Sequence, residues 1–325
     1  MRPFDYRRAG DVAEATAEAR EDSASYIAGG TNIVDLMKLE VSTPARLVDI
    51  SRLPLQGIGQ TQDGGLRIGA MVSNSSVAAD ADVRQRYPLL ARAILAGASG
   101  QIRNKASVGG NLLQRTRCAW FQDISAACNK REPGKGCAAK DGPNRMNAVL
   151  GVSEHCIAAH PSDMAVALRA LNARIEVTGA DGAARLVAMD DFYHLPGDTP
   201  HRETCLAPGD LVTAVILPPP TGDTQIYRKI RDRASYAFAL VSVGAVLRMQ
   251  DGKIAAVGLA FGGVAPRPWS DPAVEQLLIG QQPSEKLFAQ AAELLVSSAT
   301  GHGGNDFKIT MVQRLLAAVL REACT

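Results

Sequence analysis

The spacing of apolar residues switches several times along the chain between the period of a helix and that of a strand. Near the N-terminus, residues 12–22 carry Ala and Glu at a density that favours a helix, and Tyr26–Ala28 is a short apolar stretch that ends in Gly29-Gly30. Thr31-Asn32 supplies N-cap residue types to residues 33–39, whose apolar positions repeat at helical spacing. The start of the chain therefore predicts a strand, a glycine turn and a helix.

The same kind of pattern continues as far as a run of three prolines. We expect strands at residues 46–50, 66–70, 173–178, 185–188 and 211–217, and helices at about 84–96 and 161–171. A second glycine turn is expected at Ser107–Asn111. Pro218–Pro220 then interrupts the pattern, because proline cannot donate to a sheet or continue a helix. We place a domain boundary there.

The residues beyond the prolines predict a small second domain. A strand is expected from Ile226, and two more, Leu240–Met249 and Lys253–Phe261, flank Asp251-Gly252, a typical two-residue hairpin turn. Two amphipathic helices are expected at about residues 283–298 and 308–322. Strands followed by helices favour an antiparallel sheet with helices on one face, which makes the predicted fold class α+β.

Composition narrows the class of protein. The chain has 325 residues, of which 46% are hydrophobic and 21% charged, a mixture typical of globular domains. Its 35 Lys and Arg residues nearly balance 33 Asp and Glu, so the basic surface of a nucleic-acid or anionic-membrane binder is not expected. The longest apolar run, Ala237–Leu247, is too short for a membrane span, and the first residues show no apolar core of an export signal.

The two glycine turns suggest a phosphate-binding site. Each places backbone N–H groups before a helix, where they and the helix dipole favour an anion, and two such loops can hold a pyrophosphate from opposite sides. Neither Gly29–Asn32 nor Ser107–Asn111 contains G-x-G-x-x-G or G-x-x-x-x-G-K-[ST]. A Rossmann dinucleotide site and a P-loop are therefore disfavoured.

Four of the six cysteines are clustered in one segment of unusual composition. Residues 115–147 are rich in Arg, Lys, Asn, Pro and Gly, and their apolar residues show neither helical nor strand spacing. A long stretch of this kind is typical of a functional loop. The clustered cysteines are Cys118, Cys128, Cys137 and Cys156. Four thiolates suit zinc or an iron–sulfur cluster, but neither paired zinc knuckles nor a ferredoxin motif is present. Spacing alone leaves zinc, a cluster, two disulfides and unlinked thiols open.

The motifs together resemble a known family. Ala28–Asn32, Ser107–Asn111, Ser162-Asp163 and Tyr227–Lys229 with Arg233 resemble, in order and spacing, the FAD-binding subunit of the molybdenum hydroxylases. The resemblance extends over nearly the whole chain and is strongest to bacterial aldehyde oxidoreductases of three subunits.

The resemblance implies a definite domain organisation. An FAD-binding fold of the vanillyl-alcohol-oxidase and CO dehydrogenase flavoprotein type would occupy residues 1–220, with subdomains at about 1–55 and 56–220. A cysteine-bearing insertion at about 115–156 would lie within it. A C-terminal domain like that of CO dehydrogenase flavoproteins would occupy residues 221–325.

The resemblance also implies site residues. FAD would be held by Tyr26, Ile27, Ala28, Gly29, Gly30, Thr31, Asn32, Ile33 and Val34 along the pyrophosphate and ribityl chain, by Ser107, Gly110 and Asn111 at the phosphates, by Asp163 at a sugar hydroxyl, and by Val212 and Lys229 at the isoalloxazine. An aromatic residue that contacts the flavin in eukaryotic relatives has no counterpart here, because the aligned position is Gly97. The sequence therefore assigns no side chain to one face of the isoalloxazine ring.

The resemblance further implies a [4Fe–4S] cluster on Cys118, Cys128, Cys137 and Cys156. It makes the chain the electron-transfer subunit of a heterotrimer that oxidises aldehydes, with a molybdopterin-binding large subunit and a [2Fe–2S] small subunit as partners and an external electron acceptor. Co-export to the periplasm with a signal-bearing partner is expected, with the cytoplasm as the alternative. A stand-alone flavin dehydrogenase and a metal-braced assembly scaffold without flavin are the two other functions considered.

Overall fold

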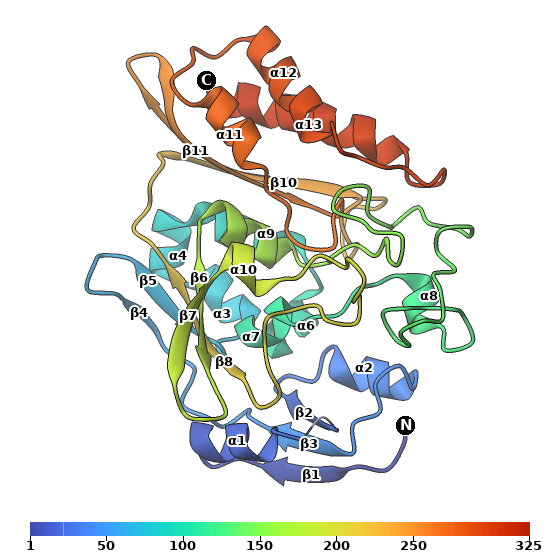
Figure 1. The fold of residues 1–325 in the computed structure, drawn as a ribbon. Coiled ribbons are helices and arrows are strands. Elements are labelled where there is room, and N and C mark those ends of the chain that lie inside the picture. The colour runs from blue at the N-terminus through green and yellow to red at the C-terminus, as the bar shows by residue number, and fades with distance from the viewer. Residues whose placement is uncertain (22) are drawn as a thin grey trace.

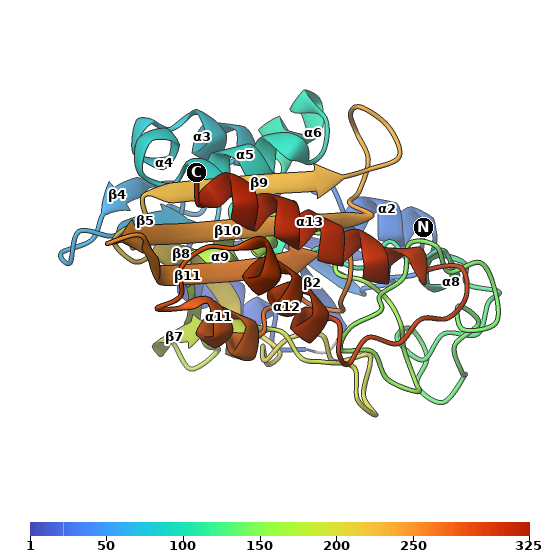
Figure 2. The ribbon, with the colours of Figure 1, turned by 90° about the horizontal axis from the view of Figure 1, so that it is seen from above.

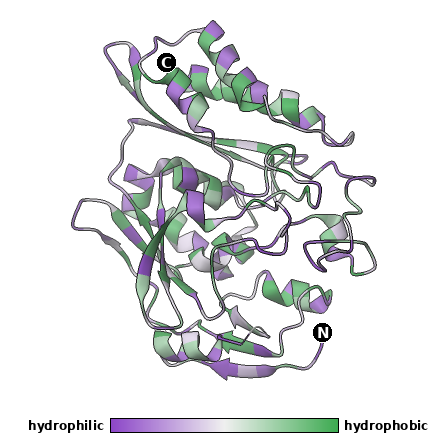
Figure 3. Ribbon diagram, viewed as in Figure 1, coloured by the Kyte–Doolittle hydropathy of each residue, from purple (hydrophilic) through white to green (hydrophobic). Residues whose placement is uncertain are grey.

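The computed structural model describes residues 1–21 and 23–325. Its N-terminal part is a small parallel sheet with strand order β1-β3-β2. The elements are β1 (Asp5–Arg8), α1 (Val12–Glu18), β2 (Ala24–Ile27), α2 (Ile33–Lys38) and β3 (Arg46–Asp49). The Asp11 side chain caps α1 by accepting a hydrogen bond from the backbone N–H of Glu14. All four residues of β1 are exposed, and this edge strand is mostly hydrophilic in Figure 3.

The central part is a five-stranded antiparallel sheet with helices packed against it, as Figure 1 shows. Its strand order is β4-β5-β8-β6-β7. The strands are β4 (Ile58–Gln60), β5 (Leu66–Gly69), β6 (Arg174–Thr178), β7 (Ala184–Ala188) and β8 (Leu211–Leu217). The helices are α3 (Asn74–Ala79), α4 (Ala81–Arg86), α5 (Pro88–Ala96), α6 (Gly100–Lys105), α7 (Val108–Leu112), α9 (Asp163–Ala170) and α10 (Met189–Phe192).

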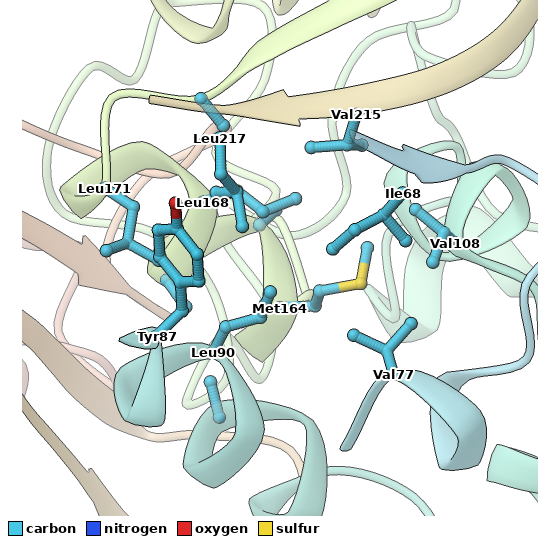
Figure 4. Close-up of a cluster of buried hydrophobic side chains, with 14 of the residues drawn as sticks. Ile68, Val77, Tyr87, Leu90, Val108, Met164, Leu168, Leu171, Val215 and Leu217 are labelled. Atoms are coloured by element: carbon cyan, nitrogen blue, oxygen red, sulfur yellow. The ribbon is translucent and has the colours of Figure 1, made fainter. Parts of the chain in front are cut away.

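Buried side chains of this sheet and its helices form one hydrophobic core. In Figure 4, Ile68 and Val215 of the sheet face Leu90 of α5 and Met164 of α9. Each of these four side chains is at most 2% exposed. Because α9 is fixed on this core from one side, its first residue, Asp163, has a defined position at the edge of the core.

The prediction of a single helix at about residues 84–96 is wrong in one respect. The structure has two helices here, because Pro88 begins α5 as its first residue and α4 ends at Arg86. Proline has no N–H to donate to the preceding turn, but it is well suited to the first position of a new helix. The break allows α5 to turn its apolar face onto the core.

The C-terminal part confirms the expected antiparallel sheet with helices. Its strand order is β11-β10-β9. The elements are β9 (Thr224–Ile230), β10 (Val241–Gln250), β11 (Lys253–Gly262), α11 (Pro272–Leu278), α12 (Glu285–Leu295) and α13 (Phe307–Ala323). Asp251 and Gly252 form the hairpin turn with φ of 51° and 71°, the left-handed values of a type I′ turn. Helices α12 and α13 lie across the sheet in Figure 2, while α5 and α9 pack on its other face.

Residues 115–156, which we call the cysteine segment, contain a single short helix, α8 (Ala119–Gln122), among turns. The segment lies beside α2 and the C-terminal sheet in Figure 1. A small apolar cluster joins Leu36 of α2 to Phe121 of the segment and to Ile157, which directly follows it. Among the helices that the structure describes, none combines the length and apolar character needed to cross a bilayer.

Candidate functional site

The first glycine loop lies between β2 and α2 and packs closely on the end of α6. A Cβ atom on Gly29 would lie 1.9 Å from the carbonyl oxygen of Lys105, so only glycine fits there. Gly30 has a φ of +74°, a left-handed conformation that glycine adopts readily. The side chains of Ile27 and Val34 pack under Gly30, since a Cβ there would lie 3.7 Å and 3.2 Å from them. These two residues support the loop.

The second glycine loop begins α7. The Ser107 hydroxyl caps this helix by accepting a hydrogen bond from the Gly110 N–H at 3.1 Å. The side-chain oxygen of Asn111 accepts one from the Ser162 hydroxyl at 2.6 Å, which ties the loop to the start of α9. Close packing of Gly29 on Lys105, two residues before Ser107, brings the two glycine loops together.

Two adjoining cavities open on either side of these loops. Their volumes are about 280 and 570 Å³, and Thr31, Asn32 and Gly110 line both. The side-chain nitrogen of Asn32 is buried and has no hydrogen-bond partner among the described residues. A buried donor without a partner is costly unless a ligand completes it. The junction of the cavities therefore fits a polar group such as a pyrophosphate.

The predicted FAD residues are distributed unequally between the cavities. The smaller one is lined by Tyr26, Ala28, Gly29, Gly30, Thr31, Asn32, Ile33, Ser107, Gly110 and Val212. The larger one is lined by Thr31, Asn32, Gly110, Asn111 and Asp163. The structure thus places Val212 and Asp163 in different cavities, and Lys229 reaches the larger one through Asp163.

A buried ion pair fixes Asp163 at the larger cavity. Lys229 Nζ donates to Asp163 Oδ2 at 2.8 Å and to the Ala96 carbonyl at 3.1 Å, and the two paired side chains are only 4% and 8% exposed. The Tyr227 hydroxyl donates to the other carboxylate oxygen. Burial and the Asp163 charge hold the pKa of Tyr227 well above its usual value, so it stays a hydrogen-bond donor.

Gly97 has a structural explanation that the sequence did not provide. A Cβ on Gly97 would lie 3.0 Å from Asp163 Oδ2, closer than nearly all such contacts. A larger residue at this position would crowd the carboxylate that Lys229 holds.

Aromatic and cationic groups that the sequence did not assign complete the larger cavity. Tyr236 and Phe238 line it from the loop between β9 and β10, and Arg103 lines it from α6. Tyr236 has a positive φ of 51°, and the Arg233 side chain donates to its carbonyl oxygen at 2.9 Å. Either ring has the flat apolar surface that the missing aromatic residue would supply.

Arg117 also lines the larger cavity, and part of its hydrogen-bonding capacity is unused within the described part of the chain. Its guanidinium lies 5.1 Å from the centre of the Phe238 ring, and its buried Nε has no hydrogen-bond partner among the residues described. Burial lowers the pKa of Arg117, while the nearby Asp35 opposes that shift. An arginine is charged at neutral pH under all these conditions. Arg117 is therefore available to an anionic or carbonyl group in the cavity.

The four clustered cysteines surround one small cavity. It is lined by Cys118, Cys128, Cys137 and Cys156. None of the four is joined in a disulfide in this structure. The Asn147 side chain donates to Cys118 Sγ at 3.4 Å, and the Ala158 N–H donates to Cys156 Sγ at 3.5 Å. Burial raises the pKa of Cys156 to about 11, so this side chain is a neutral thiol unless a bound cation stabilises its thiolate.

The spacing of the metal-ligand side chains can be compared with that of a single-ion site. Zinc draws its thiolates to about 2.3 Å. Within residues 1–21 and 23–325, no three His, Cys, Asp or Glu side chains converge closely enough to hold one metal ion. An iron–sulfur cluster is larger than one ion and holds its four thiolates farther apart.

Comparison with known proteins agrees with this geometry. The family described as "FAD binding domain in molybdopterin dehydrogenase" matches residues 2–220, and the "CO dehydrogenase flavoprotein C-terminal domain" matches residues 225–323. The aldehyde oxidoreductase FAD-binding subunit PaoB of Escherichia coli (strain K12) is 52% identical over 325 residues, covering 99% of each chain. The glyceraldehyde dehydrogenase medium chain of Sulfolobus acidocaldarius is 26% identical and covers 96% of this chain and 95% of its own.

Solved structures lead to the same family. The Cu,Mo-CO dehydrogenase in its cyanide-inactivated form contains a chain that matches with a TM-score of 0.77 and 25% identity, over 100% of this chain and 99% of that one. The family resemblance, the fold class, the flavoprotein assignment and the assignment as an oxidoreductase subunit are confirmed. This chain belongs to the FAD-binding medium subunits of the molybdenum hydroxylase family.

Proposed function

We propose that this chain is the electron-transfer subunit of a complex that oxidises aldehydes to carboxylic acids, passing electrons from partner clusters to an external acceptor. The observation that carries the proposal is the pair of glycine loops facing two adjoining cavities, in a chain 52% identical to an aldehyde oxidoreductase FAD-binding subunit. When bound, FAD supplies the exchange between one-electron and two-electron chemistry. Substrate oxidation itself belongs to a partner chain.

The cavities favour one orientation of FAD. We place the adenosine half in the smaller cavity, the pyrophosphate at Asn32 and Gly110, and the isoalloxazine in the larger cavity. This placement keeps Lys229 near the ring, but it moves Val212 to the adenosine half and Asp163 to the ring, away from the positions that the family resemblance implies. The larger cavity has the volume, the aromatic side chains Tyr236 and Phe238, and the Asp163 carboxylate that a flat, polar-edged ring requires. Lys229 holds that carboxylate in place and contributes positive charge nearby.

An Arg117→Gln variant will test whether FAD occupies the larger cavity. We expect it to bind FAD about 10-fold to 100-fold more weakly, because a hydrogen bond from a charged group contributes about 1.5–3 kcal/mol. Fluorescence titration of the deflavinated protein measures the change. Arg84 is exposed on α4 and lines neither cavity, so Arg84→Gln is the matched control. Unchanged FAD affinity in Arg117→Gln would contradict the assignment.

We further propose that the four clustered cysteines hold a [4Fe–4S] cluster. The support is their convergence on one cavity, their free thiols, two hydrogen bonds to sulfur and the neighbouring Lys130, which lines the same cavity. Hydrogen bonds and positive charge near the sulfurs stabilise thiolate ligands and a reduced cluster. The cluster would supply a one-electron centre, and the segment would provide its insulated pocket.

A Cys128→Ser variant will test the cluster. We expect it to lose iron and acid-labile sulfide together, because three thiolates hold such a cluster poorly. Iron, zinc and sulfide are measured per chain in the purified protein. Cys324→Ser is the control, since Cys324 lies at the end of α13, away from the cysteine cavity. Stoichiometric zinc without sulfide in the native protein would refute the cluster.

We also propose a heterotrimer with a molybdopterin-binding large subunit and a [2Fe–2S] small subunit, located in the periplasm by co-export. The support is the family itself, whose relatives include medium chains of dehydrogenases. Affinity purification followed by metal analysis and cell fractionation tests both points. Flavin bands in the purified chain would exclude a scaffold without flavin, while reduction of the isolated chain by an aldehyde would favour a stand-alone dehydrogenase instead.

A further inference from the structure

Arg115 connects the first glycine loop to the rest of the cysteine segment. Its backbone N–H donates to the side-chain oxygen of Asn32 at 2.9 Å, and this bond orients the amide whose nitrogen faces no partner in the described chain. Its guanidinium lies 4.9 Å from the centre of the Phe121 ring, which belongs to the core around the cysteines. One residue therefore contacts both predicted cofactor sites.

Glu203 links Arg115 to a second cation at the cysteine cavity. One carboxylate oxygen pairs with the Arg115 guanidinium, and the other accepts from Lys130 Nζ at 2.8 Å. Lys130 is 8% exposed, lines the cysteine cavity and also donates to the Pro200 carbonyl at 2.9 Å. Burial alone would raise the pKa of Glu203, but Lys130 and Arg115 hold it below its usual value. The carboxylate is therefore ionised and shared by the two sites.

The loop that carries Glu203 also borders the smaller cavity. The Tyr26 hydroxyl donates to the carbonyl of Gly209 at 2.9 Å, and Asp210 lines that cavity beside Tyr26. A shift of this loop would thus reach the adenosine end as well as Arg115. Removing one partner from such a buried network leaves an uncompensated charge, so the network has few alternative arrangements.

We propose that Glu203 is a positioning residue that couples the two cofactor sites, so that the chain binds FAD more tightly when the cysteine segment holds its cluster. When the cysteine segment holds its cluster, Lys130 and Phe121 are held in place. Lys130 then positions Arg115 through Glu203, and Phe121 positions it through the ring contact. Arg115 in turn orients Asn32 at the proposed pyrophosphate position. The inference rests on the proposed function, because it requires both FAD and the cluster. Coupling between binding sites is reciprocal, so FAD also stabilises the cluster.

A double-mutant cycle tests the coupling. FAD dissociation constants are measured by fluorescence titration of the deflavinated native chain, Cys128→Ser, Glu203→Gln and the double variant. We expect each single variant to bind FAD about tenfold more weakly, and the double variant no more weakly than the weaker single one. Glu203→Asp should recover part of the affinity. Native protein equilibrated with an iron chelator should retain more iron when FAD is present.

The matched control is Glu154→Gln. Glu154 also pairs with a lysine of the cysteine segment, Lys140 at 2.6 Å, but its side chain is 89% exposed. We expect its FAD affinity and iron content to equal those of the native chain. If Glu203→Gln does not fold, Arg115→Lys takes its place in the cycle. Lysine keeps the positive charge but lacks the planar guanidinium group that pairs with the carboxylate.

The possible outcomes separate the two proposals. Native protein without iron and sulfide overturns the cluster and the coupling with it. If the native protein holds a cluster but Cys128→Ser binds FAD with unchanged affinity, the coupling alone is overturned. The same holds if the fold-losses in FAD affinity of the two single variants multiply in the double variant. Non-additive losses together with chelator protection by FAD support it.

Discussion

A Lys229→Met variant will lose about 3–5 kcal/mol of unfolding free energy, because it leaves the Asp163 carboxylate buried without its cation. The two side chains are 4% and 8% exposed and their charged atoms lie 2.8 Å apart, so loss of the ammonium leaves the carboxylate with little access to water. Methionine preserves most of the volume of the lysine stem. Urea denaturation of the deflavinated protein measures the loss. FAD affinity should fall in parallel, because Asp163 lines the larger cavity.

The neighbouring Arg228 provides the control. It lies on the same strand but on the opposite face, and it pairs with Glu322 where both side chains are about half exposed. Arg228→Met should therefore cost no more than about 1 kcal/mol. Combining Lys229→Met with Asp163→Asn should restore part of the stability, because the buried charge is then removed. A loss below about 1 kcal/mol in Lys229→Met would show that the pair is solvated in solution.

Local patterns predicted much of the fold and part of the site. Alternation on a strand places Tyr227 and Lys229 on one face and Arg228 on the other, which is how the structure arranges them. The strand, glycine and helix sequence around Gly29-Gly30 predicted the first loop because glycine there permits a close approach that side chains prevent. These features depend on residues a few positions apart.

The remaining features depend on contacts between distant residues. Glu203 meets Arg115 and Lys130 only after the chain has folded, and no periodicity marks it. Arg117 became a candidate because the structure shows its Nε buried without a partner. Strand β1 was missed because its residues, Asp5–Arg8, are all exposed and show no apolar alternation, although they pair with β3 through the backbone.

A Gly29→Ala variant will lose FAD during purification and about 1–3 kcal/mol of unfolding free energy, the usual cost of overpacking. The new Cβ would lie 1.9 Å from the Lys105 carbonyl oxygen and 2.7 Å from its carbon. Because both contacts are with backbone, either the first glycine loop or the end of α6 must move. Either movement separates the two loops at the proposed pyrophosphate position.

Gly100→Ala is the control that isolates this clash from a general effect of removing glycine. Gly100 begins the same helix, α6, and an added Cβ there meets no atom within 4 Å. The substitution should be neutral or stabilise the protein by about 0.4–1 kcal/mol, because alanine restricts the unfolded chain more than glycine does. The flavin absorbance per chain of Gly100→Ala should equal that of the native protein, while Gly29→Ala should show almost none. Full flavin content in Gly29→Ala would mean that contact between the loops is dispensable, and the proposed pyrophosphate position would then be wrong.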